Sequence, residues 1–110
     1  GGLEASYLAR GYARQFAEMV NQLDELRRFD PEGFTGQSIG IGAMVDCELD
    51  EYVSTFYLLP CCGGMELEID GREITIITPQ SPIGRALMRK IGGENYTLPN
   101  GRMGKVIKVL

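Results

Sequence analysis

Residues 81–90 read Ser-Pro-Ile-Gly-Arg-Ala-Leu-Met-Arg-Lys, and this stretch decides the fold. Serine caps the free backbone N–H groups at the start of a helix, and proline fits the first helical position, where its missing N–H costs nothing. Ile83, Ala86 and Leu87 fall on one face of such a helix, whereas the arginines point elsewhere, and Gly92-Gly93 ends it. The stretch therefore predicts a short helix docked on a sheet.

Strand-like segments lie on both sides of this helix. Residues 65–69 and 72–78 alternate between apolar and polar side chains around Asp70-Gly71, which is the strongest short hairpin signal in the chain. Four further strands are expected at 44–49, 53–59, 95–98 and 103–110, with turns at Asp50-Glu51 and Pro99-Asn100-Gly101. The sequence thus predicts an α+β protein in which an antiparallel sheet carries one short helix.

A long helix is expected before the sheet, from about residue 6 to residue 28. Its apolar residues recur at alternating spacings of four and three, which is typical of a coiled-coil seam: Ala5, Ala9, Tyr12, Phe16, Met19, Leu23 and Leu26. At about 1.5 Å per residue the arm is roughly 35 Å long. The sequence divides into a helical arm, 1–34, and a sheet domain, 35–110. The seam needs a partner: a helix upstream of Gly1, a second subunit, or the sheet itself.

Composition narrows the possible functions. The chain of 110 residues has no histidine, which removes Ser-His and Cys-His nucleophile pairs and the commonest general base. Three cysteines, two of them adjacent (Cys61 and Cys62), fit neither a disulfide framework nor a zinc site. We therefore expect a cytoplasmic protein that is not itself an enzyme and has no metal, no cofactor and no membrane segment.

Charge is distributed unevenly along the chain. Residues 1–80 hold 5 Lys/Arg and 14 Asp/Glu, a net charge of −9, whereas residues 81–110 hold 6 Lys/Arg and one acid, a net charge of +5. Such asymmetry indicates either a solvated rim or a basic face directed at an acidic partner. No aromatic residues are interleaved with these basic residues, so direct binding of single-stranded nucleic acid is not expected.

Residues 39–110 resemble the C-terminal domain of the bacterial GreA/GreB transcript-cleavage factors. Two segments carry the resemblance: Gly40-Ile41-Gly42-Ala43-Met44-Val45 and Ser81-Pro82-Ile83-Gly84-Arg85-Ala86-Leu87. The Asn100-Gly101 turn and the closing Lys105–Val109 stretch fit the family's last hairpin. The resemblance implies an FKBP-like sheet that docks at the secondary channel of RNA polymerase, with nucleic acid contacted only indirectly. It also implies an N-terminal coiled coil whose two acidic tip residues hold magnesium for RNA hydrolysis.

The chain departs from the family pattern at that tip. Residues 3–30 correspond only to the returning helix of the coiled coil, and Glu4 is the only acid near the expected tip. Because one carboxylate does not hold the metal, we expect a polymerase-binding factor that does not support cleavage. The related Rnk group, whose members resemble non-cleaving competitors of Gre factors, fits equally well.

The resemblance places the polymerase contact at the start of the short helix. The expected contact residues are Ser81, Pro82, Gly84, Arg85 and Arg89. Two other functions remain open: peptidyl-prolyl isomerisation, suggested by the FKBP-like fold, and dimerisation through the seam of the arm. An FKBP-like fold alone does not confer peptidyl-prolyl isomerase activity, since this reaction needs an apolar pocket lined by aromatic side chains.

Overall fold

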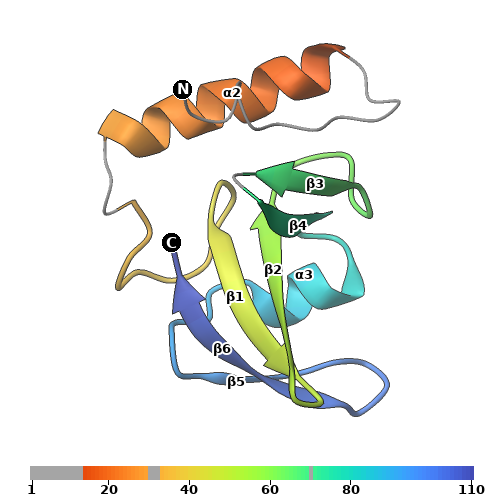
Figure 1. The fold of residues 1–110 in the computed structure, drawn as a ribbon. Helices are drawn as coiled ribbons and strands as arrows, with labels where there is room; N and C mark the ends of the chain where they lie inside the picture. Colours follow the sequence, from red (N-terminus) through yellow and green to blue (C-terminus); the bar gives the residue numbers. More distant parts are fainter. Residues whose placement is uncertain (1–13, 30–32, 70) are drawn as a thin grey trace.

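A computed structural model describes residues 14–29, 33–69 and 71–110. Two helices and six strands occur in this part of the chain (Figure 1). In chain order they are α2 (Arg14–Phe29), β1 (Met44–Leu49), β2 (Tyr52–Leu58), β3 (Glu66–Ile69), β4 (Arg72–Ile77), α3 (Pro82–Leu87), β5 (Asn95–Thr97) and β6 (Met103–Val109). The α+β class and the short helix after β4 are therefore confirmed. The first half of the predicted arm, including Ala5, Ala9 and Tyr12, lies outside the described residues.

The six strands form one sheet in the order β3-β4-β2-β1-β6-β5. β3 and β4 pair antiparallel as predicted, and the turn at Asp50-Glu51 joins β1 to β2. Both residues of the latter turn have positive φ, 51° and 70°, which suits the right-handed twist of the strands.

The prediction of a purely antiparallel sheet is wrong in one pair. β2 and β4 run parallel, with Phe56 opposite Thr75 and Leu58 opposite Ile77. The chain leaves β2 at residue 59, forms the edge strand β3, and turns back into β4 between β3 and β2. The sheet is therefore mixed, and β4 rather than β3 fills the interior position.

Each face of the sheet has its own apolar cluster. Val45, Cys47, Val106 and Leu87 belong to the cluster on the side of α3, which lies behind the sheet in Figure 1. The second cluster lies beneath α2 and contains Tyr57, Leu59, Leu67, Ile74, Ile76 and Phe16. α2 crosses the end of the sheet that holds β3 and β4 (Figure 1).

The described part of the α2 seam faces the sheet. Phe16 is only 4% exposed, and Met19 and Leu23 pack against the second cluster. Leu26, the last residue of the seam, is 65% exposed. Of the three partners considered for this seam, the sheet itself thus covers Phe16, Met19 and Leu23, and these side chains are not free to pair with a second helix.

Candidate partner-binding site

The start of α3 is built by Ser81 as the sequence predicts. Ser81 has an extended backbone (φ −68°, ψ 156°), and its Oγ accepts a hydrogen bond of 3.0 Å from the backbone N–H of Gly84. The same hydroxyl donates to the carbonyl oxygen of Thr78 at 2.7 Å, and Pro82 occupies the first helical position. The Ser81 hydroxyl thus provides hydrogen-bond partners for the N–H of Gly84 and the carbonyl oxygen of Thr78, at the point where the chain passes from β4 into α3.

Gly84 allows α3 to approach the backbone of Thr78. A β-carbon placed on Gly84 would lie 1.8 Å from the Thr78 carbonyl oxygen and 2.8 Å from the carbonyl carbon, distances that no side chain can occupy. Gly84 is also buried. Its role is to set the position of the helix, so any part that it plays in binding a partner is indirect.

Residues beside the two segments that carry the family resemblance are hydrogen-bonded to each other just after α3. The N–H of Arg89 donates to the carbonyl oxygen of Ile39 at 3.0 Å, and the N–H of Ile39 donates to the carbonyl oxygen of Lys90 at 2.8 Å. Ile39 and Leu87 are both almost fully buried in the same cluster. Two stretches about fifty residues apart in the sequence are therefore held together, with Arg89 at a positive φ of 67°.

A groove of about 340 Å³ lies beside α3. α3 contributes Pro82, Arg85 and Ala86, and the opposite wall is formed by Thr97, Leu98 and Pro99 at the end of β5. None of these lining residues is aromatic, so the groove lacks the aromatic walls that a prolyl isomerase pocket needs. Its lining is mostly apolar, and Arg85 is the one charged residue among the lining residues.

The five predicted contact residues occupy three kinds of position. Pro82 and Arg85 are exposed and line the groove. Ser81 and Gly84 lie behind them as the cap and the close-approach position. Arg89 is exposed beyond the end of α3 and does not line the groove. Sequence reasoning missed the wall formed by residues 97–99, because only the packing of β5 beside α3 brings it there.

The basic residues of the last thirty positions do not form one face. Lys105 and Lys108 lie opposite Glu48 and Asp46 across the β1–β6 pair, and Arg102 forms an ion pair with Asp50. Arg85 and Arg89 have no acidic partner among the described residues. Within the described part of the chain, Arg85 and Arg89 therefore place two unpaired positive charges at and just beyond α3.

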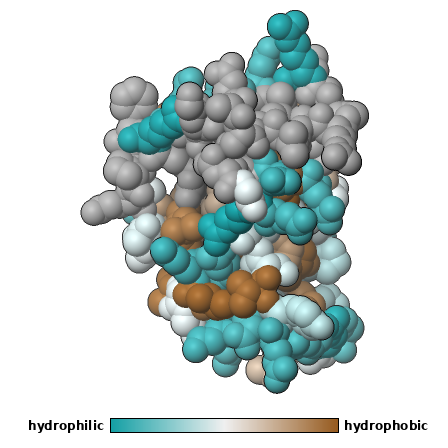
Figure 2. Space-filling model, viewed as in Figure 1, coloured by the Kyte–Doolittle hydropathy of each residue, from teal (hydrophilic) through white to brown (hydrophobic). Residues whose placement is uncertain are grey.

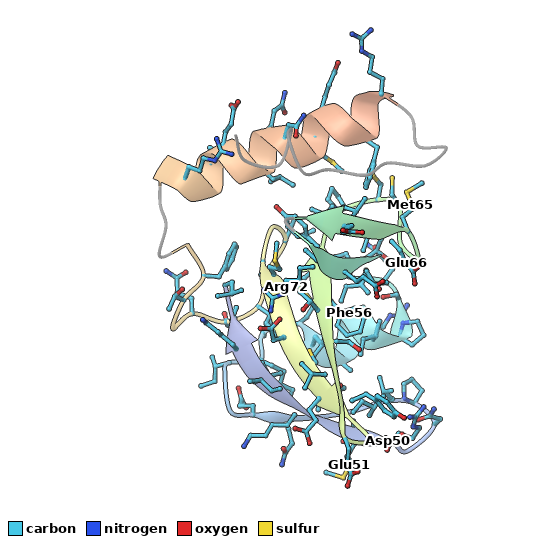
Figure 3. All side chains as sticks on the ribbon, in the orientation of Figure 1. Asp50, Glu51, Phe56, Met65, Glu66 and Arg72 are labelled. Atoms are coloured by element: carbon cyan, nitrogen blue, oxygen red, sulfur yellow. The ribbon has the colours of Figure 1, made fainter. Side chains whose placement is uncertain are left out.

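A cluster of polar side chains lies on the face of the sheet opposite α3. Arg72 Nη2 lies 2.8 Å from both carboxylate oxygens of Asp46, and Thr55 Oγ1 donates to Asp46 Oδ1 at 2.8 Å. Arg72 lies on the near side of the sheet in Figure 3, and the coloured part of the surface on this side is largely hydrophilic, with an apolar band and smaller apolar patches (Figure 2). The cluster joins β1, β2 and β4 and satisfies its own charges, which is typical of a structural ion pair.

Burial beneath α3 raises two pKa values. Burial of the Cys47 thiol, aided by the Asp46 carboxylate, raises its pKa from 9.0 to about 12. Burial raises the pKa of Tyr96 from 10.0 to about 12, and the nearby Cys47 adds to this shift. Since the folded state holds these protons more tightly, both groups contribute stability below about pH 9 that is lost as the pH rises toward about 12.

We therefore expect the free energy of unfolding to fall across this alkaline range. Urea titrations at a series of pH values would measure the fall, and a Cys47→Ala variant should show a shallower one because one of the two protons is then absent. If the free energy of unfolding fell equally steeply with pH in both proteins, the raised pKa of Cys47 would be contradicted.

The described residues contain neither a candidate metal site nor a candidate membrane-spanning helix. No group of three or more Cys, Asp or Glu side chains there could hold a metal ion. Neither described helix is long and apolar enough to cross a membrane. Glu4, the one acid expected near a coiled-coil tip, lies outside the described residues.

Comparison with known proteins identifies the fold. No protein-family model and no curated protein matches the chain. Among solved structures it is similar to the crystal structure of GreA factor homolog 1 (Gfh1) of Thermus thermophilus, with a TM-score of 0.53 and 21% identity over 87% of this chain and 70% of that one. It is also similar to Gfh1 of Thermus aquaticus, with a TM-score of 0.53 and 20% identity over 92% of this chain and 74% of that one. At these identities the likeness concerns structure: the chain has a Gre-factor-like fold.

Proposed function

We propose that this chain is a transcription elongation factor-like protein that binds bacterial RNA polymerase near its secondary channel. The observation that carries the proposal is the Gre-factor-like fold, in which Ile39, just before the first of the two segments that carry the resemblance, is hydrogen-bonded to Arg89 and Lys90, just after the second. Such a protein would work in the cytoplasm and would reach nucleic acid only through the transcription complex.

The groove beside α3 is the proposed polymerase contact. A rigid helix start presents Pro82 and Arg85 at its edge, and Arg89 extends the positive charge beyond the helix. Exposed arginines without an intramolecular partner form charge-assisted hydrogen bonds with carboxylates of a binding partner at little reorganisation cost. We therefore expect an acidic or mixed acidic and apolar surface on the polymerase side.

We further propose that residues 1–110 do not by themselves support transcript cleavage. Metal-assisted hydrolysis needs a pair of hard oxygen ligands, and the sequence places a single acid, Glu4, near the expected tip. The protein would then act as Rnk-type regulators are expected to act, by occupying the channel entrance in competition with cleavage factors.

Neutralising both arginines tests the site. An Arg85→Gln/Arg89→Gln variant should bind core RNA polymerase about tenfold or more weakly in a pull-down or fluorescence titration, because two charged contacts of about 1 kcal/mol each are removed. The matched control is Lys105→Gln/Lys108→Gln, which removes the same charge from positions opposite Glu48 and Asp46. Equal weakening by the two variants would show that net charge, rather than α3, governs binding.

A further inference from the structure

Two adjacent thiols lie outside the candidate groove, in the turn between β2 and β3. The Sγ atoms of Cys61 and Cys62 are 2.9 Å apart, and all three cysteines of the chain are free. A disulfide bond is about 2.05 Å long, so bond formation requires the sulfur atoms to approach by about 0.9 Å. These two side chains are therefore already positioned for reaction with each other.

The backbone of the turn explains this position. Successive side chains of an extended strand point to opposite faces, which would keep the two sulfur atoms apart. Cys62 instead has a positive φ of 69°, a conformation that few non-glycine residues adopt. Gly63-Gly64 follows, with Gly64 at φ 91° and nothing within 4 Å of a β-carbon placed on it. The turn can thus change conformation when a bond between the two sulfur atoms forms.

The two thiols differ in their surroundings. Cys61 is exposed, whereas Cys62 is half-buried and packs against the apolar cluster beneath α2. The hydrogen bond with Cys61 raises the pKa of the Cys62 thiol. Cys61 is therefore the sulfur that meets an oxidant first, and Cys62 is the sulfur placed to resolve the product.

We propose that Cys61 and Cys62 form an oxidation site at which a peroxide converts the dithiol into an intrachain disulfide. The Cys61 thiol loses its proton and its sulfur attacks hydrogen peroxide; the O–O bond breaks, and the departing hydroxide takes up that proton and leaves as water while Cys61 becomes a sulfenic acid. The Cys62 sulfur then attacks the Cys61 sulfur, the S–O bond breaks, and the second water leaves. The dithiol loses two electrons and two protons, the peroxide is reduced to two waters, and an external dithiol reverses the reaction by exchange.

Ring closure affects the packing beneath α2. Cys62 packs on the same apolar cluster that Phe16, Met19 and Leu23 contact from the helix. Met65, which packs on this cluster as well, marks the end of the turn at the edge of the sheet in Figure 3. Formation of the bond shifts the Cys62 sulfur atom at the border of this cluster, so we expect oxidation to weaken the attachment of α2 to the sheet.

Mass spectrometry of the peroxide-treated chain tests the chemistry. Cleavage after glutamate releases residues 52–66, a peptide that contains Cys61 and Cys62 but not Cys47. After treatment this peptide should have lost two hydrogen atoms and all labelling by a maleimide, and dithiothreitol should restore both. Cys61→Ser and Cys62→Ser are the matched controls, because neither variant can close the ring. Fragmentation of the peptide locates any added oxygen, because Met65 in the same peptide is also oxidised by peroxide. Oxygen added to the cysteines with no loss of two hydrogen atoms, or a peptide found only in disulfide-linked dimers, would overturn the proposal.

Hydrogen exchange tests whether oxidation weakens the attachment of α2 to the sheet. Backbone amides of Arg14–Phe29 should exchange faster in the oxidised wild type than in the reduced protein, and peroxide should leave exchange unchanged in the Cys61→Ser variant. Equal protection of α2 in the oxidised and reduced wild type would contradict the proposed link between the ring and the helix.

Discussion

Replacing Gly84 with alanine should destabilise the protein by about 3 kcal/mol or more. Helix propensity alone predicts the opposite sign, since alanine in a helix is more favourable than glycine by about 1 kcal/mol. Contact with Thr78 decides the outcome: the added β-carbon would lie 1.8 Å from its carbonyl oxygen and 2.9 Å from Ser81 Oγ. Both neighbours are held by the cap of α3, so relief requires the helix to move off the sheet.

Gly92→Ala is the matched control for this change. It lies just after the same helix, and a β-carbon placed on it would meet only the carbonyl oxygen of Ile107, at an ordinary 3.6 Å. Urea or thermal unfolding of the two variants should separate them clearly, with Gly92→Ala close to the wild type. Similar midpoints for Gly84→Ala and Gly92→Ala would show that α3 is not held against Thr78 as described.

Replacing Gly104 with alanine should also lower the free energy of unfolding, by about 2 to 4 kcal/mol. Gly104 lies opposite Tyr96 in the β5–β6 pair, and the tyrosine ring covers it. An added β-carbon would lie 2.3 Å from Tyr96 Cζ and 2.5 Å from the carbonyl oxygen of Glu48. Tyr96 is held in place because it is 2% exposed and its hydroxyl donates to that same carbonyl oxygen at 3.2 Å.

A double-mutant cycle with Tyr96→Ala distinguishes this contact from a general weakening of β6. Removing the ring relieves part of the clash, so the two changes together should cost less than their sum, with a coupling of about 1 kcal/mol or more. Urea unfolding of the four proteins measures it. Strictly additive costs would contradict the packing of Tyr96 over Gly104.

Local signals in the sequence predicted the local structure well. Asp70-Gly71 predicted the β3–β4 hairpin, and Ser81-Pro82 predicted both the cap and the first residue of α3. The seam of the N-terminal helix indicated the face that Phe16 and Leu23 turn toward the sheet. Each of these features depends on residues a few positions apart, where turn chemistry and helix periodicity dominate.

Features that depend on distant parts of the chain were not predicted. The parallel pairing of β2 with β4 arises because β3 takes the edge position, and nothing in the alternation of Val53–Leu59 distinguishes one neighbour from another. The far wall of the groove was missed because Thr97 and Leu98 meet α3 only after β5 has paired with β6. The burial of Gly84 was missed for the same reason, since its contact with Thr78 depends on how α3 folds back on β4.

The most direct test of the proposed function is a hydrogen-exchange footprint of the chain with and without core RNA polymerase. Polymerase should slow exchange at residues 82–90 and 97–99, which flank the groove, and leave β3 and the Asp46–Arg72 face unchanged. Protection of that opposite face, or no protection anywhere at saturating polymerase, would contradict binding through α3.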